Sequence, residues 1–214
     1  EPVIEGGWLY GLGRADMQSG VAVGMKLFER LANLDNINVI FAGTVDEEGD
    51  STVNLTLLDS GLQRDMCIIP EPSSGTVMMG CRGRTVFQVE VRGTSAHGAR
   101  PEEGVNAITE ASRFIGKLGN LRLLEHPTLP RGSYCVLEIS GGTRTLSVPD
   151  TCRIKLDRHY VTGESQDEIK KDLENMASGL GSHADFNIRF SPERQTPFLE
   201  PYITENKGLA KEFL

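Results

Sequence analysis

The first third of the chain combines continuous apolar runs with helical spacing, the pattern of an α/β domain. Residues 37–42 and 65–70 are short, almost uninterrupted apolar runs bounded by turn residues. Such runs are typical of strands buried on both faces, as in a parallel sheet. Between residues 17 and 34, apolar residues recur in two rows at helical spacing. This breadth predicts a helix packed on the sheet. A second helix is expected around residues 52–62.

Beyond about Gly75 the apolar pattern changes to alternation. In the predicted strand 85–92, Phe87, Val89 and Val91 share one face and polar residues share the other, as in an antiparallel sheet with one solvated face. The predicted elements are strand 85–92, helix 103–118, strand 133–139, strand 152–160, a helix opened by the capping box at 165–168, and strand 185–190. This order is that of the ferredoxin-like split fold. We therefore expect an α/β protein that carries an α+β domain.

Composition narrows the classes of partner. The 214 residues can form one or two domains, and the net charge of -8 without a basic stripe argues against nucleic acid as a partner. No apolar run reaches the ~18 residues of a membrane span, and no signal-peptide pattern opens the chain. Four scattered cysteines, Cys67, Cys81, Cys135 and Cys152, lie in or beside apolar strands without CxxC spacing, a pattern typical of reduced thiols in the core. We expect a cytoplasmic protein that binds neither nucleic acid nor membrane.

Acidic residues follow both predicted buried strands. The run 44–50 places four carboxylates in five positions directly after strand 37–42, and Glu71 ends strand 65–70. Asp16 leaves a glycine-rich loop at the start of the first helix. Ligands gather beyond the carboxyl ends of parallel strands, and clustered acids repel one another, so the pattern indicates a divalent metal site. The alternatives are a solvated acidic turn and a helix-capping role for Asp16.

Four ordered motifs resemble a known family. Residues 93–101, continuing through 104–108, resemble the lid-domain signature of the di-zinc exopeptidases and deacylases, which include aminoacylase-1, acetylornithine deacetylase, succinyl-diaminopimelate desuccinylase and carboxypeptidase G. Residues 9–20, 44–48 and 69–73 resemble that family's glycine-rich loop, Asp-Glu-Glu run and Glu-Pro turn. The resemblance covers residues 1 to about 205.

The resemblance implies a two-domain architecture. Residues 1–76 and 191–214 would be two pieces of a partial zinc-exopeptidase-like α/β catalytic domain. Residues 77–190 would be an inserted ferredoxin-like α+β lid that pairs two chains into a homodimer.

The same resemblance assigns roles to individual residues. Asp16 would bridge two metal ions, Glu48 would bind one of them and Glu71 the other. Glu47 would be the general base that takes a proton from water, and His97 would donate to the oxyanion in the partner subunit's active site. An exposed or capping loop histidine is the alternative for His97. The metals would be zinc, with cobalt or manganese as alternatives. The carboxylates considered by themselves suit Mg²⁺ or Mn²⁺ better.

Arg158 breaks the apolar register of its predicted strand. It falls on the same face as Ile154, Leu156 and Tyr160, where a guanidinium requires an anion. The resemblance implies that Arg158 binds the substrate carboxylate. The alternative is an arginine at a strand end that reaches solvent.

The chain also departs from the family pattern. Leu146 stands where the family usually has Asn, and Ser147 is at best a shifted substitute. The family's two histidine metal ligands are expected outside residues 1–214. The motifs together predict a metal-dependent hydrolase of an N-acyl or peptide bond in a small carboxylate-bearing substrate. We expect the 214-residue form to hold no tight zinc and to lack activity. The alternatives are a non-catalytic binding protein and a chain that serves only in dimerisation.

Overall fold

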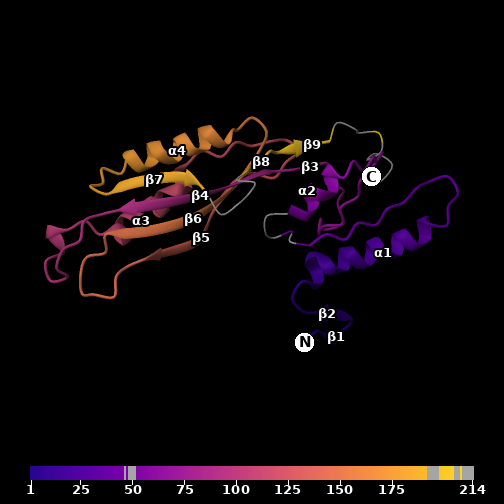
Figure 1. Ribbon diagram of the computed structural model, residues 1–214, viewed down its shortest axis with the longest axis horizontal. Helices are drawn as coiled ribbons and strands as arrows, with labels where there is room; N and C mark the ends of the chain where they lie inside the picture. Colours follow the sequence, from indigo (N-terminus) through magenta and orange to yellow (C-terminus); the bar gives the residue numbers. More distant parts are fainter. Residues whose placement is uncertain (46, 48–51, 192–197, 205–207, 209–214) are drawn as a thin grey trace. The chain divides into compact units, whose positions relative to one another are not determined.

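The computed structural model describes residues 1–45, 47, 52–191, 198–204 and 208. The chain divides into two compact units, Glu1–Met78 and a second that begins at Met79 (Figure 1). The boundaries expected from the sequence, at 76/77 and 190/191, stay predictions.

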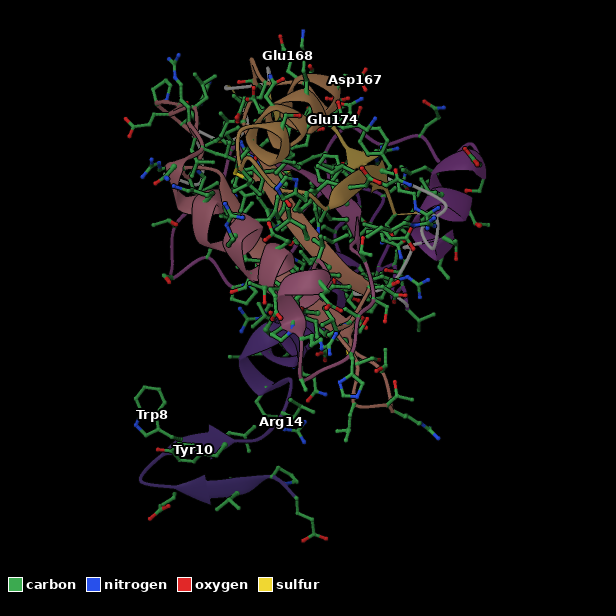
Figure 2. The ribbon with its side chains drawn as sticks, turned by 90° about the vertical axis from the view of Figure 1, so that its left-hand side faces the viewer. Trp8, Tyr10, Arg14, Asp167, Glu168 and Glu174 are labelled. Carbon is green, nitrogen blue, oxygen red and sulfur yellow. The ribbon has the colours of Figure 1, made fainter. Side chains whose placement is uncertain are left out.

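The first unit contains a hairpin and two helices. Strands β1 (Val3–Glu5) and β2 (Trp8–Tyr10) pair antiparallel around Gly6 and Gly7, which both have positive φ. Trp8 and Tyr10 are exposed on the hairpin (Figure 2). A short π-helical turn η1 (Arg14–Gln18) leads into α1 (Ser19–Leu31), and α2 spans Thr52–Asp59. None of the described residues of this unit is buried.

The prediction of strands at 37–42 and 65–70 was wrong for this structure. In the described part of the chain neither segment belongs to a β-ladder. They nevertheless lie against the predicted helix. A Cβ atom on Gly20 would stand 1.9 Å from the Pro70 carbonyl oxygen, and one on Gly24 would stand 3.2 Å from the Phe41 ring. A strand requires a hydrogen-bonded neighbour, so the apolar pattern correctly placed the helix against these segments but could not supply the missing ladder.

The second unit is built on an antiparallel sheet. Its long strands are β4 (Gly83–Arg92), β5 (Ser133–Gly141), β6 (Thr151–Tyr160) and β7 (Asp185–Phe190), in the order β5-β6-β4-β7. Strand β8 (Phe198–Leu199) pairs with the start of β4, and β3 (Gly80–Cys81) pairs with β9 (Tyr202–Ile203). Helix α3 (Ala107–Lys117) follows β4, and α4 (Gln166–Ser178) follows β6. The predicted split arrangement is confirmed (Figure 1).

One face of this sheet forms the core. Phe87, Val89 and Val91 of β4 lie opposite Leu156, Ile154 and Cys152 of β6, as alternation predicted. Both helices contribute to the same cluster of buried side chains, so they cover the same face of the sheet. The helix residues in this cluster are Ala107, Ala111, Phe114, Ile169, Leu173 and Ala177.

The other face of the sheet carries cross-strand ion pairs. Asp157 accepts a hydrogen bond from Arg84 Nε at 2.8 Å and lies 3.1 Å from His159 Nε2. Burial raises the pKa of Asp157, but the hydrogen bonds from His159 and Arg84 outweigh this and hold the pKa below its ordinary value. Glu90 similarly pairs with Arg92 and, more distantly, with Arg153. The polar face that the sequence pattern indicated is therefore present, but Asp157 and Glu90 on it are buried rather than solvated.

Side-chain caps set the helix boundaries. The helix predicted from residue 103 begins at Ala107, because Asn106 accepts hydrogen bonds from Ile108 N and Thr109 N at 3.0 and 3.2 Å. A 3-10 turn at Pro101–Glu103 (η2) precedes it, and another at Leu118–Asn120 (η3) follows it. At α4, both hydrogen bonds of the predicted capping box between Ser165 and Glu168 are present. Figure 2 shows Asp167 and Glu168 at the start of α4.

Two expectations from composition bear on the described residues. All four cysteines lie in the described part of the chain, and they are free rather than paired in disulfides. Their placement in the core was wrong for Cys67, Cys81 and Cys135, which are exposed, and correct for Cys152, which is buried. In the same part of the chain, no helix has both the length and the apolar character needed to cross a membrane.

Candidate functional site

The acidic residues of the first unit do not form an assembled metal centre. Asp16, Glu47 and Glu71 are exposed, and Glu48 lies outside the described residues. Within the described ranges, no group of three or more His, Cys, Asp or Glu side chains could hold a metal ion. The described residues alone therefore do not fit a divalent metal, and the metal site stays a prediction. Helix α1 has Gln18 at its N-cap without a side-chain capping bond, so Asp16 is not the cap of α1.

The lid signature forms a loop that is joined to the β5–β6 turn. Thr94 and Val105 exchange backbone hydrogen bonds of 2.9 and 2.8 Å across the loop 93–106. On its other side, Gly98 N donates to the Leu146 carbonyl oxygen at 2.9 Å, and Val148 N donates to the Ala96 carbonyl oxygen at 2.9 Å. The loop and the turn are thus held together at one end of the sheet.

Three glycines of the signature permit this close packing. A Cβ atom on Gly93 would stand 1.9 Å from the Val105 carbonyl oxygen, and one on Gly104 would stand 2.6 Å from the Thr94 carbonyl oxygen. A Cβ atom on Gly98 would stand 2.7 Å from the Leu146 carbonyl oxygen. Each contact is with backbone, which cannot move aside as a flexible side chain can. Close backbone packing therefore explains why glycine occupies these three positions of the motif.

His97 lies at the centre of this joined loop and is exposed. Its backbone bridges to Ser147, and its Nδ1 accepts a hydrogen bond from Ala99 N at 3.1 Å. An imidazole nitrogen that accepts a hydrogen bond carries no proton. In the neutral ring the proton is therefore on Nε2, which can donate to an oxygen atom of a ligand.

Arg158 is fully buried inside the second unit. Its guanidinium donates to the Glu164 carboxylate and to the His159 carbonyl, and it lies 4.8 Å from the centre of the Tyr134 ring. Burial raises the pKa of Tyr134, although the adjacent Arg158 acts in the opposite direction. Among the described residues, Arg158 Nε has no hydrogen-bond partner. The anion that the sequence required for Arg158 is thus present as Glu164, and substrate binding by Arg158 stays a prediction.

Sequence reasoning missed both Glu164 and Tyr134 as partners of Arg158. The signal for Glu164 was an acid six residues after the arginine, just beyond the strand, where a turn can bring it back. Glu164 is fixed in that turn because its second oxygen accepts a hydrogen bond from Val161 N at 3.0 Å. Tyr134 is directly opposite Arg158 in the β5–β6 register, which could not be known before the pairing was.

His97 and Arg158 lie at opposite ends of the sheet. The loop of His97 joins the turn that ends at the start of β6, whereas Arg158 is the eighth residue of this ten-residue strand. Seven residues of extended strand span about 20 Å. One small substrate therefore cannot contact both side chains of the same lid.

Comparison with known proteins identifies the family. Residues 79–185, half of the chain, match the model of the M20 peptidase dimerisation domain. The chain belongs to the M20 peptidase family. The resemblance that its motifs predicted, to the zinc exopeptidases and deacylases, is therefore confirmed.

Curated relatives include two proteins named desuccinylases. The chain is 30% identical over 198 residues to succinyl-diaminopimelate desuccinylase 1 of Alteromonas mediterranea, a match that covers 86% of the chain and 51% of the relative. It is 30% identical over 209 residues to succinyl-diaminopimelate desuccinylase of Aromatoleum aromaticum, which covers 90% and 54%. The chain spans about half the length of the curated relatives it matches.

Solved structures agree on the fold. A tripeptidase from Staphylococcus aureus matches with a TM-score of 0.61 at 20% identity, covering 100% of this chain and 58% of the other. Aminopeptidase PepT from Bacillus cereus matches with a TM-score of 0.53 at 20% identity, covering 99% and 57%. The predicted fold class, a partial exopeptidase-like α/β domain with a ferredoxin-like dimerisation domain, is confirmed.

The buried Arg158–Glu164 pair yields a stability prediction. Replacing Glu164 by Ala leaves the guanidinium buried without its counter-charge, so the free energy of unfolding of the second unit should fall by about 3–5 kcal/mol. Urea unfolding followed by circular dichroism measures this. The matched control is Glu174→Ala, which removes an exposed partner of Lys170 at 3.1 Å and should cost less than about 0.5 kcal/mol. Equal losses in the two variants would contradict the role given to Glu164.

Proposed function

We propose that this M20 chain is part of a metal-dependent hydrolase that cleaves an amide bond, N-acyl or peptide, in a small carboxylate-bearing substrate. The observation that carries the proposal is the joined loop around His97, which holds an imidazole donor in place within the matched family domain. The relatives named desuccinylases support amide hydrolysis, since their matches cover 86% and 90% of the chain and so extend beyond the lid.

The proposed roles follow the chemistry of each side chain. Glu47 acts as the general base that takes a proton from the attacking water. Asp16, Glu48 and Glu71 would bind the two divalent ions of the whole protein, with zinc as the metal that the family indicates and cobalt or manganese as alternatives. Arg158 would bind the substrate carboxylate, the role that the family resemblance implies; in this structure the guanidinium is fully buried and donates to Glu164.

His97 is proposed to act in the active site of a partner subunit. The separation of His97 and Arg158 along β6 supports this, because it prevents one lid from supplying both groups to one substrate. The outermost strand β5 exposes Leu137 and Ile139, at 47% and 48%, and α3 exposes Ile108 at 37%. An edge strand with apolar neighbours is a surface that pairing with a second copy would cover. We therefore propose a homodimer through β5 and α3.

Two variants of the whole protein should separate the base from the metal ligands. Glu47→Gln should abolish turnover of N-acyl amino acids and dipeptides with bound metal nearly unchanged, since it removes a proton acceptor. Asp16→Asn should lose both metal and turnover. Metal content is measured by mass spectrometry of the purified protein. Equal metal loss in the two variants would show that base and ligand are assigned wrongly.

A subunit-mixing experiment tests where His97 acts. Neither His97→Ala nor Glu47→Gln should be active alone. Dimers re-formed from equal amounts of the two variants should recover about a quarter of wild-type turnover, because half of the dimers are mixed and each mixed dimer has one intact site. Light scattering confirms that dimers form. Dimers that show no recovery would place His97 in its own subunit, and a monomeric wild type would remove the partner altogether.

A second candidate applies to the 214-residue chain by itself, namely a dimerisation module without catalysis. It is favoured by the location of every described buried residue in the second unit. This form should be a dimer in light scattering, without stoichiometric zinc and without turnover of N-acyl amino acids. Stoichiometric zinc or measurable turnover would exclude the candidate.

A further inference from the structure

The face of the sheet opposite the two helices contains a small hollow. Its volume is about 190 Å³, and its polar lining consists of Gln88, Glu138, Ser140, Arg153, Lys155 and Ser191. Pockets for drug-sized ligands occupy roughly 300–1,000 Å³, so this hollow suits only a small ligand. The lining comes from β4, β5, β6 and the residue that follows β7, and it lies entirely within the second unit.

The strand register places most of this lining in two neighbouring rows. In the first row, Lys155 of β6 lies between Glu138 of β5 and Gln88 of β4. In the second row, two residues away along β6, Arg153 lies opposite Ser140 of β5. Cross-strand partners have their Cβ atoms about 5 Å apart, so the polar ends of these side chains can reach one ligand together.

Arg153 has little counter-charge in this arrangement. On one side it is opposite the neutral Ser140, and on the other it is opposite Glu90, whose carboxylate is 3.5 Å from Arg153 Nη2. Glu90 is already bound by Arg92, which donates to one carboxylate oxygen at 3.0 and 3.2 Å. That hydrogen bond is the main cause that lowers the pKa of Glu90. The side chain of Arg153 is 59% exposed, so its guanidinium is accessible to an anion.

Two neutral groups of the lining can also donate hydrogen bonds. The Gln88 oxygen Oε1 accepts from Arg189 Nη2 at 2.9 Å, so the NH₂ group is the part of Gln88 that can donate to a ligand. The hydroxyl of Ser140, opposite Arg153, can donate as well. Glu138 is the acid of the lining and opposes an anion, but its cross-strand partner Lys155 has the opposite charge. The lining as a whole therefore favours a ligand rich in hydrogen-bond acceptors.

We propose that the hollow is a binding site for a small oxyanion, held by the guanidinium of Arg153 with hydrogen bonds from Ser140 and Gln88. A guanidinium presents N–H groups in a fork that matches two oxygen atoms of one carboxylate or phosphate. Inorganic phosphate and small carboxylates share this chemistry. Hydrolysis of an amide bond releases a carboxylate, so a product of the proposed reaction belongs to this class. The inference itself requires neither a metal nor catalysis.

Nuclear magnetic resonance of the 214-residue chain, titrated at constant ionic strength, tests this site. The probes are sodium phosphate and sodium acetate, with sodium chloride as the reference. An oxyanion should give saturable shifts of the backbone amide signals around Ser140 and Arg153. Arg153→Ala should weaken binding about tenfold, because a charge-assisted hydrogen bond is lost. Saturation by acetate alone would identify a carboxylate as the ligand, and saturation by phosphate alone would identify a phosphate.

Two further variants separate this site from general attraction to positive charge. Glu138→Gln removes the acid from the lining and should tighten binding of the oxyanion about threefold. Lys171→Ala is the control, because it removes an exposed positive charge from α4, which covers the opposite face of the sheet. Its affinity for the oxyanion should stay within about a factor of two of wild type.

Three results would overturn the proposal and leave the proposed function in place. The first is that neither phosphate nor acetate saturates the shifts. The second is equal affinity in Arg153→Ala and Lys171→Ala, which would show that Arg153 has no special role. The third is weaker binding in Glu138→Gln, which would show that this carboxylate holds the ligand and that the site does not select an oxyanion.

Discussion

The antiparallel pairing of β4 with β6 is the constraint on which the rest of the second unit depends. Ten consecutive residue pairs join the two strands, from Gly83 opposite Tyr160 to Arg92 opposite Thr151. A slip of one residue would turn every apolar side chain of a strand to the polar face. The same register directs the guanidinium of Arg158 into the core and brings the loops after β4 and before β6 to one end. The joined loop around His97 is therefore a product of the central pairing.

Much of the second unit could be predicted because its signals are local. Alternation in 85–92 and the capping box at 165–168 each lie within one element, and both predictions were correct. The start of α3 was misplaced by four residues, since apolar spacing continued through a loop that Asn106 ends by capping. In the first unit, the strands at 37–42 and 65–70 could not be settled from their own residues, because a ladder depends on neighbours elsewhere in the chain.

The candidate site shows the same division between local and distant information. The motif 93–104 was recognisable because its glycines are required by close backbone contacts within one loop and the adjoining turn. The partner of Arg158 was not recognised, although the need for an anion was. Burial of an arginine could be derived from the strand register, but Glu164 is fixed by a turn whose geometry the sequence pattern does not specify. The metal ligands are assigned from the motifs alone, since Glu48 lies outside the described residues.

The hydrogen bond from Ala99 N to His97 has a consequence for how this position can vary. The donor belongs to the peptide backbone, so almost any side chain at position 99 preserves it, and the tautomer of the imidazole is insensitive to most substitutions there. Proline is the exception, because it has no backbone N–H. The backbone conformation of the loop, rather than the side chain at position 99, thus determines which nitrogen of the imidazole carries the proton. The identity of residue 99 therefore gives little indication of this hydrogen bond.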